Sequence, residues 1–163
     1  MTLVRLVARP MLSTMFILGG INALKNADYF ADRAKPVTDR LEPLADKATA
    51  SLPIELDAKA MVRMNGLIHV VGGAMLATGR APRLTALVLA ATLVPTTLGG
   101  HRFWEETDPR ARANQRIHFC KNISIAGGLL LASVDTEGRP SLTWRAKHQA
   151  GRARKRATQL THS

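Results

Sequence analysis

The most constraining feature of this chain is an apolar run, Leu84 to Gly100, that contains no charged residue. A helix on the surface of a soluble bundle has one apolar stripe and one polar face. Here every helical direction meets Leu, Val, Ala, Thr, Pro or Gly, so no polar face exists. Such a helix must be buried on all sides, and a chain of 163 residues has no room to bury four of them. Lipid is therefore the expected surrounding medium.

Three further apolar segments accompany this run. Crossing about 30 Å of hydrocarbon takes about 17 to 25 residues. The uncharged segment Met64 to Gly79 reaches that length if Arg63 snorkels to the headgroups. The first and last segments reach it only with polar flanks, which for the first places Arg5 and Arg9 at the headgroups. We therefore expect four membrane crossings.

A cleaved signal peptide is the alternative for the first segment, because basic residues precede its apolar run. No clear A-x-A-type site follows it, and three more apolar segments come after, so we expect a retained helix. The sequence thus predicts an all-α protein, a four-transmembrane-helix bundle with a polar first loop and a basic C-terminal tail. The bundle would form one domain, 1–138, and the tail, 139–163, would be cytoplasmic.

The polar first loop, Asp28 to Lys59, separates the first two crossings. Apolar residues recur in it with helical spacing, although Pro43 would interrupt any continuous helix. These are Val37, Leu41, Leu44 and Ala48. The pattern predicts a short helix on the membrane surface, above the polar ends of the crossings. A solvated loop is the alternative, since the stretch is also rich in acidic residues.

The distribution of Lys and Arg predicts that both termini are cytoplasmic in a multi-pass protein of the cell membrane. Raw counts on the two sides are nearly level, but the tail and the turn at Gly79 to Arg83 are densely basic. Anionic lipid headgroups are the expected partner of the tail, at about 1 kcal/mol per basic residue near the surface. No base-reading motif accompanies the charge, so we expect no nucleic-acid partner.

Polar residues gather at one side of the predicted membrane domain. Ionisable residues inside membrane segments are costly and usually mark a function. Four crossings bring to the same, outer side Asn22, Lys25, Arg63, Asn65, His101, Arg102, His118, Lys121 and Asn122. The candidate ligand-binding residues are Arg63, Asn65, His69, His101, Trp104, His118, Lys121 and Asn122.

The spacing of His118, Lys121 and Asn122 places them on one helix face. One hypothesis is a site in which Lys121 holds a quinone oxygen or a sulfur oxyanion and His118 exchanges protons near neutral pH. The alternative is structural: the side chains snorkel to the headgroups and hydrogen-bond to Asn65 or His69.

Metal and thiol chemistry have little support in the sequence. No close ligand pair such as H-x-x-x-H joins the histidines, so we predict no metal and no intrinsic cofactor, and a quinone remains the candidate ligand. Cys120 is the only cysteine, which excludes an internal disulfide and a CxxC pair. Trp104, beside Phe103, is expected to be an interfacial anchor rather than a cofactor platform.

Several motifs resemble the DoxX family of small integral membrane proteins. They are RPMLSTMFILGGINALK from position 9, VRMNGLIHVVGGAMLATGRAPR from 62, LVPTTLGGHRFWEE from 93 and HFCKNISIAGGLLLASVDTEGRPSL from 118. The resemblance implies a four-helix membrane bundle and a role in a membrane redox complex, linked to quinone or to thiosulfate and other reduced sulfur. The alternative is a noncatalytic membrane anchor or scaffold that organises soluble redox enzymes. Whether the chain itself catalyses a reaction stays open.

Overall fold

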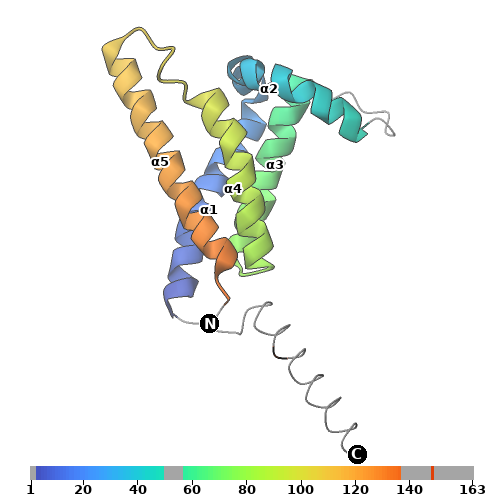
Figure 1. Ribbon diagram of the computed structural model, residues 1–163, viewed down its shortest axis with the longest axis vertical. Coiled ribbons are helices and arrows are strands. Elements are labelled where there is room, and N and C mark those ends of the chain that lie inside the picture. The colour runs from blue at the N-terminus through green and yellow to red at the C-terminus, as the bar shows by residue number, and fades with distance from the viewer. Residues whose placement is uncertain (1–2, 50–56, 137–147, 149–163) are drawn as a thin grey trace, which may run out of the picture.

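The computed structural model describes residues 3–49, 57–136 and 148 and shows an all-α chain within those ranges (Figure 1). The predicted fold class is confirmed. The helices are α1 (Leu3–Lys25), α2 (Ala27–Thr49), α3 (Ala58–Ala77), α4 (Pro82–Gly100) and α5 (Pro109–Val134). The predicted basic tail and its boundary at 138 lie outside the described residues, apart from His148.

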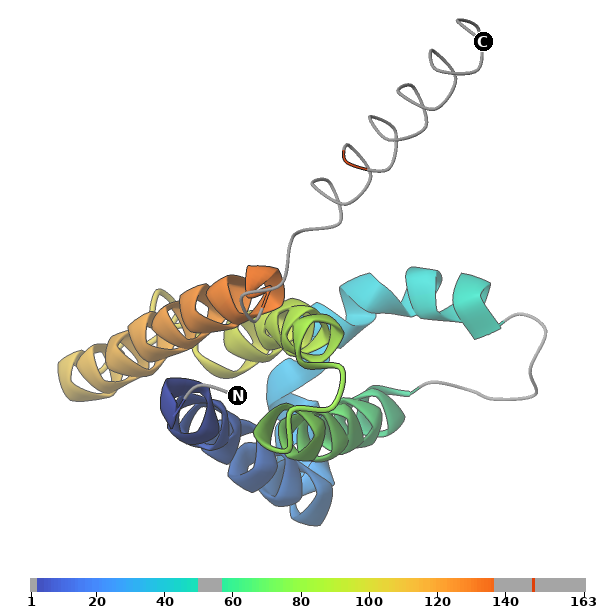
Figure 2. The ribbon, with the colours of Figure 1, turned by 90° about the horizontal axis from the view of Figure 1, so that it is seen from below.

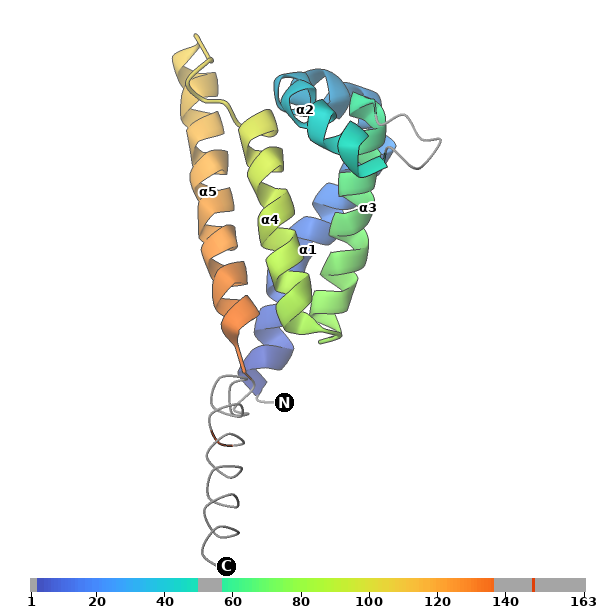
Figure 3. The ribbon, with the colours of Figure 1, turned by 45° about the vertical axis from the view of Figure 1, so that its right-hand side comes forward.

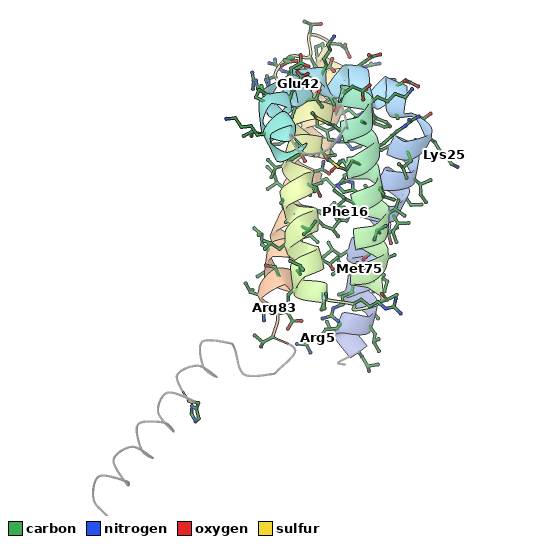
Figure 4. All side chains as sticks on the ribbon, turned by 90° about the vertical axis from the view of Figure 1, so that its right-hand side faces the viewer. Arg5, Phe16, Lys25, Glu42, Met75 and Arg83 are labelled. Atoms are coloured by element: carbon green, nitrogen blue, oxygen red, sulfur yellow. The ribbon has the colours of Figure 1, made fainter. Side chains whose placement is uncertain are left out.

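Four of the helices, α1, α3, α4 and α5, run lengthwise, and α2 lies across one end of them (Figures 1 and 3). Seen along the bundle, α1 and α3 form one layer and α4 and α5 the other (Figure 2). Contact is most extensive within these two pairs, and α3 and α4 join the layers. We call the end crossed by α2 the α2 end and the opposite one the far end. Lys25 and Glu42 lie at the α2 end, and Arg5 and Arg83 at the far end (Figure 4).

The four lengthwise helices are each long and apolar enough to cross a membrane. Large apolar side chains are exposed along them, including Val4 at 74% and Leu131 at 73%. A water-soluble bundle would bury such residues rather than display them on every helix. The prediction of four crossings is confirmed.

Glycines allow α1 and α3 to pack closely. A Cβ atom added at Gly20 would lie 2.6 Å from the carbonyl oxygen of Gly66, and one at Gly73 would lie 2.7 Å from Ile17. Small residues at such positions let helices in lipid gain van der Waals contact that larger side chains would prevent. The resulting core also contains Phe16, Leu76, Leu89, Leu93 and Leu129.

The polar first loop contains a helix, as predicted, but α2 is longer than expected. The expectation that Pro43 would interrupt it is wrong, because α2 continues through both Pro36 and Pro43 over 23 residues. Each proline removes one backbone hydrogen bond. Both prolines are exposed, so water can reach the carbonyls that they leave unbonded. Ala34 of α2 packs over Gly99 of α4, which secures the helix across the bundle.

Ionic contacts close the far end of the bundle. Arg5 of α1 donates two hydrogen bonds to Asp135, at 2.7 and 2.8 Å, and Arg9 lies 3.9 Å from the same carboxylate. Arg83 of α4 donates to the carbonyl oxygen of Ser133 at 3.0 Å. The sequence predicted Arg5 and Arg9 at the headgroups. It did not identify Asp135 as the protein group that both of them bind.

Candidate functional site

Three of the predicted site residues form hydrogen bonds between helices. Asn65 Nδ2 donates to Thr96 Oγ1 at 2.9 Å, and Asn122 Nδ2 donates to Thr97 Oγ1 at 3.1 Å. His69 Nε2 lies 3.2 Å from the hydroxyl of Thr92. All three threonines belong to α4, which therefore forms polar contacts with α3 on one side and α5 on the other.

Which group donates in each of these hydrogen bonds follows from the other hydrogen bond that the threonine hydroxyl makes. Thr96 donates to the carbonyl oxygen of Thr92, Thr97 to that of Leu93, and Thr92 to carbonyls one turn earlier. Because each hydroxyl proton is already used, each hydroxyl oxygen can only accept. His69 must therefore carry its proton on Nε2 and donate it. These side chains fit a structural role in joining the helices.

The polar residues of α5 have hydrogen-bond partners other than those that the structural alternative predicted. The alternative in which His118, Lys121 and Asn122 hydrogen-bond to Asn65 or His69 is wrong for the contacts that the structure shows. Asn122 binds a threonine of α4, and His118 and Lys121 contact each other. The physical reason is the arrangement of layers, because α5 packs against α4 and α4 presents its own hydroxyls there.

A second group of polar residues lies where α4 ends and α5 passes it. The imidazole rings of His101 and His118 are stacked, with centroids 5.2 Å apart and planes 18° from parallel. His101 Nδ1 lies 2.8 Å from Gln115 Oε1, and Lys121 Nζ lies 3.2 Å from His118 Nδ1. We call His101, Gln115, His118 and Lys121 the dihistidine cluster. All four side chains are partly buried.

Proton positions in the dihistidine cluster follow from its partners. The amide oxygen of Gln115 can only accept, so His101 donates from Nδ1, and its neutral form has the lone pair on Nε2. The ammonium of Lys121 can only donate, so His118 accepts at Nδ1 and carries its proton on Nε2. The cluster thus places two imidazole rings beside one ammonium group.

The environment disfavours a charge on His101. Burial lowers the pKa of its imidazole below the ordinary 6.5, the hydrogen bond to Gln115 opposes that shift, and nearby cationic groups lower the pKa further. Those groups are Lys121 and Arg33 of α2, and His118 acts in the same way whenever its own imidazole carries a proton on both nitrogens. The dihistidine cluster is therefore a partly buried region of positive potential.

The acidic side chain nearest in sequence to this region already has a partner. Glu105 binds Arg102 at 3.0 Å, and Arg102 also donates to the carbonyl oxygen of Arg33 at 3.5 Å. Among the described ion pairs, none joins Lys121 to a carboxylate. An anionic ligand would therefore supply negative charge beside Lys121 that these described ion pairs do not.

Three aromatic side chains from the loop after α4 and from α5 pack against one another. Trp104, Phe103 and Phe119 pack edge to face, with centroids 5.2 to 5.9 Å apart. Trp104 remains 46% exposed, and Arg112 donates to the carbonyl oxygen of Phe103. An exposed indole on an aromatic base fits the expected interfacial anchor. Phe119 directly follows His118 on α5, and Phe103 comes two residues after His101, so the trio lies close to the cluster in the sequence.

Arg63 lies apart from the dihistidine cluster. It is exposed near the start of α3, where Asp28 of α2 pairs with Lys59. The hydrogen bond from Lys59 is the main cause of the lowered pKa of Asp28, and Arg63 adds a smaller effect. Asn22 and Lys25 are exposed as well. The structure thus separates the eight candidates into helix cross-links, a cluster and exposed residues.

Two residues of this region were missed. Gln115 is three residues before His118, so the helical spacing that identified Lys121 also identifies it. Arg33 comes from α2, and no spacing in the sequence relates it to α5. No group of three potential metal ligands occurs within the ranges that the structure covers. Cys120 is exposed on α5.

Four apolar crossings joined by buried hydroxyl and amide contacts define a multi-pass α-helical membrane protein. The family model described as DoxX matches residues 4–102. The chain therefore belongs to the DoxX family. The match covers α1 to α4 and ends at Arg102, so α5 with His118 and Lys121 lies beyond it, although the sequence resemblance was expected to include that helix. No curated protein matches the chain significantly. The same is true of solved structures.

Proposed function

We propose that this protein is a component of a membrane-associated redox complex, and that it binds a quinone or a small sulfur anion at the dihistidine cluster. The observation that carries the proposal is the stacked pair His101 and His118 with the ammonium of Lys121 beside it. Such a group joins hydrogen-bond donors, a proton acceptor and positive charge at one partly buried place.

The cluster has the groups that a quinone headgroup requires. A quinone oxygen accepts hydrogen bonds, which Lys121 Nζ and His118 Nε2 can donate, and reduction of the quinone consumes protons. His101 Nε2 has a lone pair for proton exchange, and imidazole is suited to that role near neutral pH. Phe119 and its aromatic neighbours offer an apolar surface to the ring.

Electrons would come from a partner. The single cysteine cannot form a dithiol pair, so the reactive sulfur of sulfur chemistry would belong to another protein. Soluble redox enzymes are the proposed partners, bound on the cytoplasmic side if both termini lie there. The basic tail would then contact them or the anionic lipid headgroups of the cell membrane. A reporter protein fused after Ser163, assayed in spheroplasts, tests this orientation.

A noncatalytic anchor is the second candidate, and one observation favours it. Asn65, His69 and Asn122, three of the eight candidate residues, are engaged with threonines of α4. A protein whose polar groups mainly hold its helices together would serve to position other enzymes. Truncation after Gly138, followed by recovery of complexes from membranes, tests this role, because an unchanged set of partners would contradict it.

The redox proposal is tested by a double variant, His118→Phe with Lys121→Met. We expect quinone binding and thiosulfate-dependent quinone reduction in membranes to fall at least tenfold, since the variant removes both donors. Arg116→Gln is the matched control, because Arg116 is an exposed cation on the same helix. Equal quinone binding and reduction in the double variant and the control would reject the site.

A further inference from the structure

We propose that the dihistidine cluster binds a small oxyanion together with one proton. The ligand is a sulfate-like or phosphate-like group, either free or carried by a lipid headgroup. This inference deepens the proposed function, because it assigns a ligand class and a coupled proton to the same site. The inference requires that the ligand binds at the dihistidine cluster, as the proposed function states, but it does not require electron transfer.

The first support is charge. Lys121 of α5 and Arg33 of α2 bring positive charge to His101 from two different helices. The loop after α4 adds Arg102, whose charge is balanced by Glu105. Gln115 is neutral and accepts from His101. Among the groups that act on His101 and the ion pair beside it, positive charge therefore exceeds negative charge.

The second support is the contact between Lys121 and His118. His118 Nδ1 accepts from the ammonium, so its lone pair is in use when the site is empty. A proton on that nitrogen would end the hydrogen bond and place two cations side by side, with the His101 ring 5.2 Å away. A counter-charge at this point would offset the repulsion between the two cations.

An oxyanion changes this balance. Lys121 can turn its ammonium to the anion, and an imidazolium at His118 donates its new Nδ1–H to a second oxygen of the same ligand. The proton comes from solvent and is released with the anion. Because each ligand favours the other, anion affinity must rise as pH falls, and anion binding must take up a proton.

The test uses inorganic sulfate and the full chain in nanodiscs of phosphatidylcholine. Titration calorimetry at pH 7.5, in two buffers with different ionisation enthalpies, gives the number of protons taken up. We expect between one half and one proton per sulfate, and an affinity that rises up to about tenfold per pH unit of acidification. Binding without proton uptake, or no sulfate binding at all, overturns the proposal.

Variants separate the two halves of the proposal. Lys121→Gln should weaken sulfate binding at least tenfold, whereas Lys121→Arg keeps the charge and should bind within about threefold of the unchanged protein. His118→Gln should retain weaker binding and lose most of the proton uptake. Arg116→Gln should match the unchanged protein. If Lys121→Gln and Arg116→Gln bind equally well, the anion is held elsewhere and the proposal is wrong.

The source of the ligand is resolved in the same phosphatidylcholine nanodiscs with a soluble lipid headgroup, glycerophosphoglycerol. Displacement of sulfate by this phosphodiester would identify a lipid phosphate as the ligand, and no displacement would identify a free oxyanion. Both results support an oxyanion site. Proton-coupled sulfate binding without quinone reduction would reject the redox role and keep this inference. Quinone reduction without proton-coupled sulfate binding would reject this inference and keep the redox role.

Discussion

Arg5 and Asp135 are 130 residues apart and form a two-point ion pair that joins the first turn of α1 to the residue that ends α5. Arg9, only 7% exposed, lies 3.9 Å from the same carboxylate. Helices α1 and α5 have little contact with each other, and Figure 1 shows them diverging toward the α2 end. This carboxylate therefore contributes much of the attachment between the first and last helices.

Asp135→Asn is expected to destabilise the protein in detergent by on the order of 2 kcal/mol, because charge-assisted hydrogen bonds are lost while the arginines stay partly buried. Thermal unfolding of purified protein measures the change. Asp39→Asn is the matched control, since Asp39 is exposed on α2. Equal unfolding temperatures for the two variants would show that the ion pair adds no stability.

Gly20→Ala is expected to separate α1 from α3, because the new Cβ would lie 2.6 Å from the carbonyl oxygen of Gly66. Backbone must move to relieve that contact, at a cost of about 1 to 3 kcal/mol. Gly19→Ala, one residue earlier, meets no atom within 4 Å and should be neutral. The comparison is made by denaturant unfolding in one detergent. A destabilised Gly19→Ala with an unaffected Gly20→Ala would contradict the packing.

Thr97→Val is expected to destabilise the α4–α5 contact by about 0.6 to 1.7 kcal/mol, the range for such bonds in membrane proteins. Valine keeps the shape but leaves the amide of Asn122 without its acceptor. A double-mutant cycle with Asn122→Leu isolates the pairwise energy. Additive effects of the two substitutions would mean that no coupling energy joins these side chains.

Acidification is expected to destabilise the protein through His101. Burial lowers the pKa of this imidazole in the folded state below its ordinary 6.5, so the unfolded chain takes up the proton first. The contribution is absent above about pH 7 and grows as pH falls below 6.5. Unfolding temperatures at pH 7.5 and 5.5, in buffers without sulfate or phosphate, measure it. A smaller loss of stability is expected for His101→Gln, and an equal loss would assign the effect to another group.

The sequence by itself determined the class of fold. The segment Leu84 to Gly100 is apolar on every side, and a chain of 163 residues is too short to bury four such helices in protein, so lipid must surround them. Because successive crossings alternate in direction, the sequence also determined which polar residues lie at the same end of the bundle. The sequence could also have identified Gln115 as a neighbour of His118, since helical spacing is a local property.

Tertiary structure decided what those polar residues do. The sequence does not show that α4 lies between α3 and α5, and this placement makes its threonines the partners of Asn65, His69 and Asn122. Nor does it show that His101 and His118, 17 positions apart, stack while Arg63 remains exposed. Such contacts depend on helix rotation and pairing. The rotation and pairing of the helices are set by close packing, as at Gly20 and Gly66, and the type and order of residues alone do not specify them.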